Sequence, residues 1–276
     1  MVKVYYSQEM IATIKSLSPS AHKPGEVARS WLDKFSNLEI IKPDPVSIDQ
    51  LSLVHDREFV EGVLSCQLKN GFWNRDRDVA RSLPYTSGSI LSAAREAVRN
   101  GRVAVAPCSG FHHAGWNIAH GYCTFNGLMV AASVLKSENS VDTVGIIDFD
   151  LHYGDGTDDI IDRLGIDWVK HFSAGKVFSH AWQAEEFLNS IPKIVNQMAG
   201  CDLVLYQAGA DPHIEDPMGG WLTTDQMKMR DRITFEILDK LKVPVAWNLA
   251  GGYQTPLRKV LDIHDNTMEG CLAIYD

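Results

Sequence analysis

The sequence predicts an α/β fold with three layers, α/β/α, around a mostly parallel central sheet. Short apolar runs rich in β-branched residues recur along the chain, and longer segments with helical periodicity separate them. The predicted strands are Val2 to Tyr6, Val103 to Ala106, Val144 to Phe149, Leu203 to Gln207 and Val245 to Leu249. The predicted helices cover roughly Glu26 to Phe35, Glu58 to Leu68, Ser87 to Arg99, Gly127 to Lys136, Ala184 to Met198, Thr224 to Leu241 and Pro256 to Met268.

One domain is expected to cover residues 1–276. A chain of 276 residues that is 45% hydrophobic can bury one large core, and no repeat, low-complexity tract or linker divides it. The polar and basic segment from Asn70 to Tyr85 is expected to be irregular, either as a solvated connection, the preferred interpretation, or as a loop near the mouth of a site.

Composition and charge exclude several classes of function. The formal net charge is -9 and the basic residues are scattered, so no nucleic-acid partner is expected. The chain shows neither a signal peptide nor an apolar run long enough for a membrane span. Five widely spaced cysteines without a Cys-x-x-Cys pair indicate a reducing, cytoplasmic location and no disulfide framework.

The segment from Asp148 to Gly156 has the pattern of a metal site. It follows the β-branched run from Val144 to Ile147, and a strand projects alternate residues to one side, so Asp148, Asp150 and His152 would share a face. Carboxylate oxygen and imidazole nitrogen together suit zinc or iron(II), whereas magnesium and calcium prefer oxygen alone. The alternative is a strand end with aspartates that cap the following helix.

Polar, glycine-flanked groups follow four of the predicted strands, and ligands bind at this end of open α/β sheets. Asp211, held at a turn before Pro212, is the third expected ligand. Together with Asp150 and His152 it would leave coordination positions open for water and substrate, as in a catalytic site. His213 is a rival ligand from the same turn, with a supporting role as the preferred interpretation.

The tandem histidines His112 and His113 need partners, and the carboxylates of Asp148 and Asp155 remain once the metal is satisfied. Two histidine–aspartate dyads are therefore expected, in which one imidazole takes a proton from water and the other, held charged, stabilises an oxyanion. A surface coincidence of two histidines is the alternative. Tyr253 would supply a phenol at the mouth of the site or would be a buried core tyrosine.

These motifs, in this order and spacing, strongly resemble the zinc-dependent histone deacetylase family of the arginase/deacetylase superfamily. The resemblance covers nearly the whole chain, including His22-Lys23-Pro24 and Val54-His55 upstream. It rests mainly on Gly110-Phe111-His112-His113-Ala114, Gly121-Tyr122-Cys123-Thr124-Phe125-Asn126, Asp148-Phe149-Asp150-Leu151-His152-Tyr153-Gly154-Asp155-Gly156, Gly209-Ala210-Asp211-Pro212, Asp216-Pro217-Met218-Gly219 and Gly251-Gly252-Tyr253.

The resemblance implies a role for each matching residue. It implies Asp150, His152 and Asp211 as metal ligands. It implies His113 as general base and acid, paired with Asp155, and His112 as its electrostatic partner, paired with Asp148. Tyr253 would polarise the carbonyl. Gly121 and Tyr122 would line a tunnel for the acyl chain, with Phe178 on the opposite wall, and potassium would be a further ion near the Asp148 to His152 strand.

The chain also departs from the family pattern. Ala250 stands in the glycine run before Tyr253, and the tunnel aromatic Tyr122 is a tyrosine rather than a phenylalanine. No acidic loop residue that would grip a substrate backbone aligns convincingly, although Asp76 and Asp78 lie in the right region. These differences leave the chemistry intact and the substrate open.

The expected function is metal-dependent amide hydrolysis. The metal is zinc, with iron(II) as the alternative, and the substrate class is acetyl-lysine, an acetylated polyamine or another small N-acyl amine. Two other functions remain: a ureohydrolase of the arginase type, although the bridging aspartates of its binuclear site are absent from the sequence, and a pseudoenzyme that binds acyl-lysine without turnover. The sequence leaves the oligomeric state open.

Overall fold

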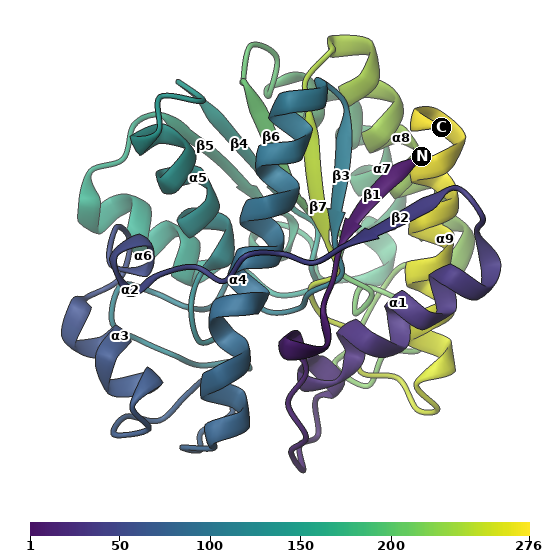
Figure 1. Ribbon diagram of the computed structural model, residues 1–276. Coiled ribbons are helices and arrows are strands. Elements are labelled where there is room, and N and C mark those ends of the chain that lie inside the picture. Colours follow the sequence, from purple (N-terminus) through teal and green to yellow (C-terminus); the bar gives the residue numbers. More distant parts are fainter.

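The computed structural model describes residues 1–276 and contains one seven-stranded sheet in which every pair of neighbouring strands is parallel (Figure 1). The strand order is β2-β1-β3-β7-β6-β4-β5. The strands are β1 (Val2–Tyr5), β2 (Leu38–Ile41), β3 (Val103–Ala106), β4 (Val144–Asp148), β5 (Val169–Ser173), β6 (Leu203–Gln207) and β7 (Val245–Asn248).

All five predicted strands are present, and the sequence missed two others, β2 and β5. Both are edge strands: β2 pairs only with β1, and β5 pairs only with β4. The central strands β3, β4, β6 and β7 are buried at every residue, whereas β2 and β5 keep partly exposed positions. An edge strand needs no continuous apolar run, which is why its sequence gives a weaker signal.

Helices cover both faces of the sheet and make the predicted three layers (Figure 1). Helices α4 and α5 pack together on one face, and α7, α8 and α9 pack side by side on the other, where α1 joins α9. The helices are α1 (Lys23–Lys34), α2 (Ile48–Leu51), α3 (Arg57–Leu64), α4 (Arg77–Asn100), α5 (Gly127–Ser137), α6 (Asp155–Leu164), α7 (Ala184–Asn196), α8 (Thr224–Leu241) and α9 (Arg258–Tyr275).

The sheet separates two apolar cores. On β3, Val103 and Val105 belong to the core under α1, α7, α8 and α9, whereas Ala104 and Ala106 belong to the core under α4 and α5. This division follows from the alternation of side chains along a strand. Because both faces are covered, the central strands are buried throughout and are apolar except at their last residues, Asp148, Gln207 and Asn248.

The expectation of an irregular loop from Asn70 to Tyr85 is wrong for its second half. Helix α4 begins at Arg77, after Asp76, whose side chain accepts hydrogen bonds from the backbone N–H groups of Asp78 and Val79. Pro84 lies inside this helix, although proline removes a backbone donor and disfavours a helix interior. Burial of the apolar face of α4 outweighs that local preference.

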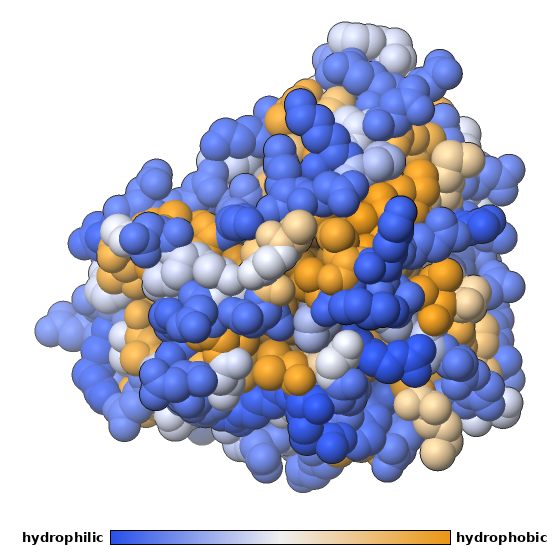
Figure 2. Space-filling model, turned by 90° about the horizontal axis from the view of Figure 1, so that it is seen from above, coloured by the Kyte–Doolittle hydropathy of each residue, from blue (hydrophilic) through white to orange (hydrophobic).

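Figure 2 views the molecule from above the view of Figure 1, onto the end at which both chain termini lie. Polar residues cover most of this face, and apolar groups lie between them. The segments that carry the predicted chemistry follow the carboxyl ends of the strands.

Candidate active site

Four neighbouring strands deliver the predicted side chains to one place. Strands β3, β7, β6 and β4 are consecutive in the sheet, and each releases one of the marked segments at its carboxyl end. His112 and His113 follow β3, Tyr253 follows β7, and Asp211 follows β6. This convergence is the arrangement expected at the carboxyl edge of a parallel sheet.

Asp150, His152 and Asp211 form a compact group of potential metal ligands. The Nδ1 atom of His152 lies 3.2 Å from Asp150 Oδ1 and 3.1 Å from Asp211 Oδ2. Ligand atoms 2.0–2.1 Å from a tetrahedral ion are roughly 3.3 Å apart, so these distances fit a zinc-sized ion with little movement. The donor set of one nitrogen and two carboxylates suits zinc or iron(II).

Backbone groups hold the two carboxylates in place. Gly251 donates its N–H to Asp150 Oδ2 at 2.8 Å, and Leu151 donates its N–H to Asp211 Oδ1 at 3.1 Å. A Cβ atom on Gly251 would lie 2.1 Å from Asp211 Oδ2 and 2.8 Å from Asp150 Oδ2. Glycine is therefore required here because the backbone approaches both carboxylates directly.

The two buried carboxylates of Asp150 and Asp211 lie close together, and their negative charges favour a bound cation. Burial and the charge of Asp150 raise the pKa of Asp211 above its usual range. Burial alone would lower the pKa of His152, but hydrogen bonds and charge from Asp150 and Asp211 outweigh it and raise this pKa to about 11. Without a metal ion the imidazolium ring compensates the two buried carboxylates, and a divalent cation would take over that role.

Both predicted histidine–aspartate dyads are formed. His112 Nδ1 lies 2.8 Å from Asp148 Oδ2, and His113 Nδ1 lies 2.6 Å from Asp155 Oδ1. These hydrogen bonds occupy the Nδ1 atoms and leave both Nε2 atoms free; His112 Nε2 is 3.6 Å from Asp150 Oδ1. The ring centroids of the two histidines are 4.2 Å apart.

The two rings differ in charge. Burial opposes protonation of His112, but the carboxylates of Asp148 and Asp150 outweigh it and raise its pKa to about 9. Burial and the charge of His112 lower the pKa of His113 to about 4. At neutral pH His112 is therefore a cation and His113 a neutral base. In acid–base catalysis a neutral ring can accept a proton, and a charged ring can stabilise a developing negative charge.

Tyr253 lies at the end of a turn that Lys23 fixes. The buried ammonium group of Lys23 donates hydrogen bonds to the carbonyl oxygens of Ala250 and Gly251 at 2.7 and 3.1 Å. Asp216 accepts the backbone N–H of Tyr253 at 2.8 Å. Burial, with Asp211 and Asp150 nearby, raises the pKa of the Tyr253 phenol well above its usual value, so the group stays a hydrogen-bond donor.

A narrow cavity of about 10 Å³, room for one water molecule, joins these groups. Its lining includes His112, Asp150, Tyr253 and the two predicted tunnel residues Gly121 and Tyr122. The rings of Tyr122 and Tyr253 are 6.0 Å apart. A Cβ atom on Gly121, whose φ is +57°, would lie 2.5 Å from the His113 ring, so this glycine also makes room for the base.

Phe178 does not line this cavity. Its ring packs in the core against Phe187 and Trp221, with centroid distances of 5.2 and 6.1 Å, and only 5% of the residue is exposed. The adjacent residue Val177 is exposed. Burial of a whole aromatic ring gains more than exposure at a tunnel wall would. His213, the rival ligand, instead contacts Gln254 and Thr224.

Sequence reasoning missed several supporting residues. Lys23 was noticed only as part of the His22-Lys23-Pro24 motif, because the polar segment around it gives no local signal that this side chain is buried. The buried Arg230 donates hydrogen bonds to the carbonyl oxygens of Phe149 and Gly209, beside the ligands that follow β4 and β6. His120 lies 3.5 Å from Asp155. Only the folded chain brings these residues to the site.

All five cysteines are free. Every helix is too short or too polar to cross a bilayer.

Comparison with known proteins supports the same family. The family model for the histone deacetylase domain matches residues 20–178 and 162–268. A probable deacetylase of Methanothermobacter thermautotrophicus is 30% identical over 45% of this chain and 39% of its own length. Histone deacetylase 8 of Xenopus tropicalis is 20% identical over 93% of this chain and 80% of its own. Acetylpolyamine amidohydrolase 1 of Pseudomonas aeruginosa is 26% identical over 61% of this chain and 56% of its own.

The fold has a close match among solved structures. The crystal structure of the HDA15 HD domain superposes with a TM-score of 0.80, covering 98% of this chain and 91% of that one at 20% identity. This likeness confirms the predicted three-layer fold. Since the family model covers most of the sequence, the chain belongs to the histone deacetylase family of hydrolases.

Proposed function

We propose that this protein is a metal-dependent deacetylase that hydrolyses the amide bond of an N-acetylated amine. The observation that carries the proposal is the geometry of the His112–Asp148 and His113–Asp155 dyads, with distances of 2.8 and 2.6 Å, beside a ligand group of two carboxylates and one imidazole. Such a set supplies a base, a charge for an oxyanion and a place for a cation within a few ångströms.

Zinc is the proposed metal, with iron(II) as the alternative, and Asp150, His152 and Asp211 would hold it. When bound, this ion would polarise the acyl carbonyl and make the attacking water more acidic. Potassium is a further proposed ion near Asp148. Strand β5 pairs Ser173 with Asp148, and the Ser173 hydroxyl donates to Asp148 Oδ2 at 3.4 Å, which adds an oxygen to that neighbourhood.

The residues of the chain divide the proton transfers. His113 accepts the proton of the attacking water at Nε2, because Asp155 holds Nδ1. The charged ring of His112 and the phenol of Tyr253 stabilise the negative charge that develops on the carbonyl oxygen. His113 then gives the proton to the leaving amine, and acetate is the second product.

The proposed substrates are acetyl-lysine, acetylated polyamines and other small N-acetyl amines. The names of two relatives, a histone deacetylase and an acetylpolyamine amidohydrolase, support both main classes. The cavity beside Tyr122 and Tyr253 has room for one water molecule, so these side chains would have to move apart to admit even a short acyl group. We also propose a cytoplasmic location, which the free cysteines support.

The two alternatives receive less support. An arginase-type enzyme needs carboxylates that bridge two metal ions, but the two groups of potential ligands in this chain share no residue. A pseudoenzyme would tolerate losses in the catalytic set, whereas both dyads and the phenol are in place.

The test is acetate release by zinc-reconstituted protein from a panel of acetyl-lysine peptides, acetylpolyamines and small N-acetyl amines. Asp211→Ala should abolish release by removing a ligand. Tyr253→Phe should lower kcat about 100-fold or more, because one oxyanion donor is lost, while zinc stoichiometry stays at the wild-type value. Tyr85→Phe, a tyrosine outside the site, is the matched control.

Three results would count against the proposal. They are no acetate release from any substrate by protein that binds zinc, release that persists in Asp211→Ala, and equal kcat in Tyr253→Phe and Tyr85→Phe. Retained binding of an acetyl-lysine peptide without turnover would favour the pseudoenzyme.

A further inference from the structure

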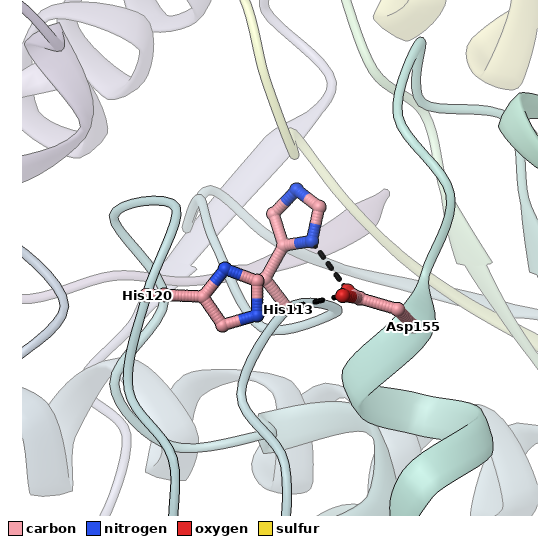
Figure 3. A group of neighbouring side chains, drawn as sticks. All are labelled: His113, His120 and Asp155. Carbon is pink, nitrogen blue, oxygen red and sulfur yellow. Dashed lines mark hydrogen bonds and ion pairs between the residues drawn. The ribbon is translucent and has the colours of Figure 1, made fainter.

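A third histidine, His120, lies next to the catalytic dyad of His113 and Asp155. The Nε2 atom of His120 lies 3.5 Å from Asp155 Oδ2, whereas His113 is hydrogen-bonded to the other carboxylate oxygen, Oδ1. Figure 3 shows the rings of His113 and His120 both directed at the Asp155 carboxylate. The two ring centroids are 5.0 Å apart. His120 has no role in the proposed deacetylation reaction.

The three side chains have the donor set of a divalent transition-metal site. Two imidazole nitrogens and one carboxylate oxygen can be brought within 4.8 Å of one another. The distance of 3.5 Å between His120 Nε2 and Asp155 Oδ2 is close to the roughly 3.3 Å that separates two ligands of a tetrahedral ion. The 2.6 Å hydrogen bond between His113 and Asp155 would have to open by less than 1 Å.

The group also has an entrance. A cavity of about 170 Å³ is lined by His113, His120 and Asp155, and Asp159 adds a second carboxylate to its wall. The side chains of His120 and Asp155 are 39% and 45% exposed, so an ion can reach them from solvent. The His113 ring lies between His120 and the group of Asp150, His152 and Asp211. The centroid of the His113 ring is 5.7 Å from that of His152.

We propose that His113, His120 and Asp155 form a second, inhibitory site for divalent transition-metal ions. An ion there occupies the Nδ1 atom of His113 and displaces its hydrogen bond to Asp155. A neutral ring that binds the ion through Nδ1 carries its proton on Nε2 instead, so no lone pair remains there to accept a proton and the base is blocked. The inhibition rests on the proposed deacetylase function, whereas the binding of the ion does not.

The second site should be weaker than the first. Asp150 and Asp211 are buried and supply two carboxylates, whereas the second group supplies one carboxylate and lies half in solvent. Zinc should therefore fill the Asp150–His152–Asp211 group first. Excess zinc should then fill the second group and stop the reaction.

The experiment titrates zinc into metal-free protein and measures bound zinc per chain by equilibrium dialysis. Wild-type protein should bind two ions, the second more weakly. His120→Ser and His120→Asn should lose the second ion or bind it at least about tenfold more weakly. His180→Ser, an exposed histidine outside both groups, is the matched control and should still bind two. Circular dichroism checks that each variant is folded.

Acetate release is followed in the same titration. Wild type and His180→Ser should be inhibited by excess zinc, and the zinc concentration that halves the rate should be at least about tenfold higher in the His120 variants. A single ion in wild type, or a second ion that both His120 variants bind as tightly, would overturn the site. A second ion that depends on His120 but leaves the rate unchanged would overturn the inhibition.

The two proposals fail in different ways. No acetate release at any zinc concentration would count against the deacetylase function alone. A second ion that depends on His120 would still establish the new site in that case, because dialysis detects it without turnover.

Discussion

The Nζ atom of Lys23 lies 2.7 Å from the carbonyl oxygen of Ala250, and the whole lysine side chain is buried. Burial lowers the pKa of this ammonium group to about 8, although Asp211 and Asp150 oppose the shift. The charge therefore balances the acidic ligands, and its hydrogen bonds fix the turn that leads to Tyr253.

Lys23→Met should destabilise the protein by about 1–3 kcal/mol, because it leaves the buried carbonyl oxygen of Ala250 without a donor, whereas that of Gly251 still accepts the N–H of Ala210. It should also lower kcat at least about tenfold, since Gly251 holds Asp150 and the same turn places Tyr253. Urea unfolding and acetate release measure the two effects. Lys23→Arg should recover part of both losses, and the exposed Lys259→Met should show neither. Lys23→Met with wild-type stability would contradict this role.

The buried His55 ties together two segments next to the tandem histidines. Its Nδ1–H donates to the carbonyl oxygen of Gly115 at 2.9 Å, and its Nε2 accepts the backbone N–H of Asn126 at 2.8 Å. The ring must therefore be neutral. Burial lowers its pKa to about 4 from the usual 6.5.

This shift predicts acid sensitivity with a definite sign. Above pH 6.5 the ring is neutral in both the folded and the unfolded chain, so it contributes no pH dependence. As the pH falls from 6.5 to 4, only the unfolded chain takes up the proton, and His55 should cost about 1 kcal/mol of stability per pH unit. Urea unfolding between pH 4.5 and 7.5 measures the slope.

The control for this effect is His55→Gln. This variant should be less stable at pH 7.5, and its stability should depend less on pH below 6.5 than that of the wild type. His180→Gln should keep the wild-type slope. Equal slopes in all three proteins would show that His55 does not titrate in this range.

Metal affinity should rise with pH. The pKa of His152 is raised to about 11 when no cation is bound, so the ring carries a proton at pH 7 that a metal ion must displace. Each proton released on binding increases the apparent association constant up to about tenfold per pH unit. Competition with a chelator at pH 6.5, 7.5 and 8.5 measures the slope for zinc. An affinity that does not change with pH would show that His152 is already neutral.

The sequence predicted those parts of the site that depend on neighbours along the chain. Asp150 and His152 follow one strand at a spacing of two, and this local pattern is enough to place both on one side. The histidine–aspartate pairs were also predictable, because parallel strands of one sheet end at the same edge, although β7 and β6 lie between β3 and β4.

The remaining features depend on distant segments. Lys23 reaches Ala250 only after α1 has packed against the sheet, and no local pattern marks such a contact. The edge strand β5 gains its conformation from pairing with β4, so its mixed sequence gave no signal. Phe178 was assigned by resemblance alone, and the packing of its ring against Phe187 decided its position instead.

Ala250 has a φ of +50°, a left-handed conformation that is costly for any residue with a Cβ atom. The cost is about 1–2 kcal/mol, and glycine avoids it but loses about 0.4–1 kcal/mol through the greater freedom of the unfolded chain. Ala250→Gly should therefore leave the free energy of unfolding unchanged or raise it by up to about 1 kcal/mol. Ala250→Val should lower it by about 2 kcal/mol or more, because a β-branched residue is poorly tolerated at positive φ. Urea unfolding of the two variants at pH 7.5 measures both changes. If Ala250→Gly were less stable than Ala250→Val, the left-handed conformation of Ala250 would carry no strain. Lys23 would then not be needed to hold the turn in that conformation.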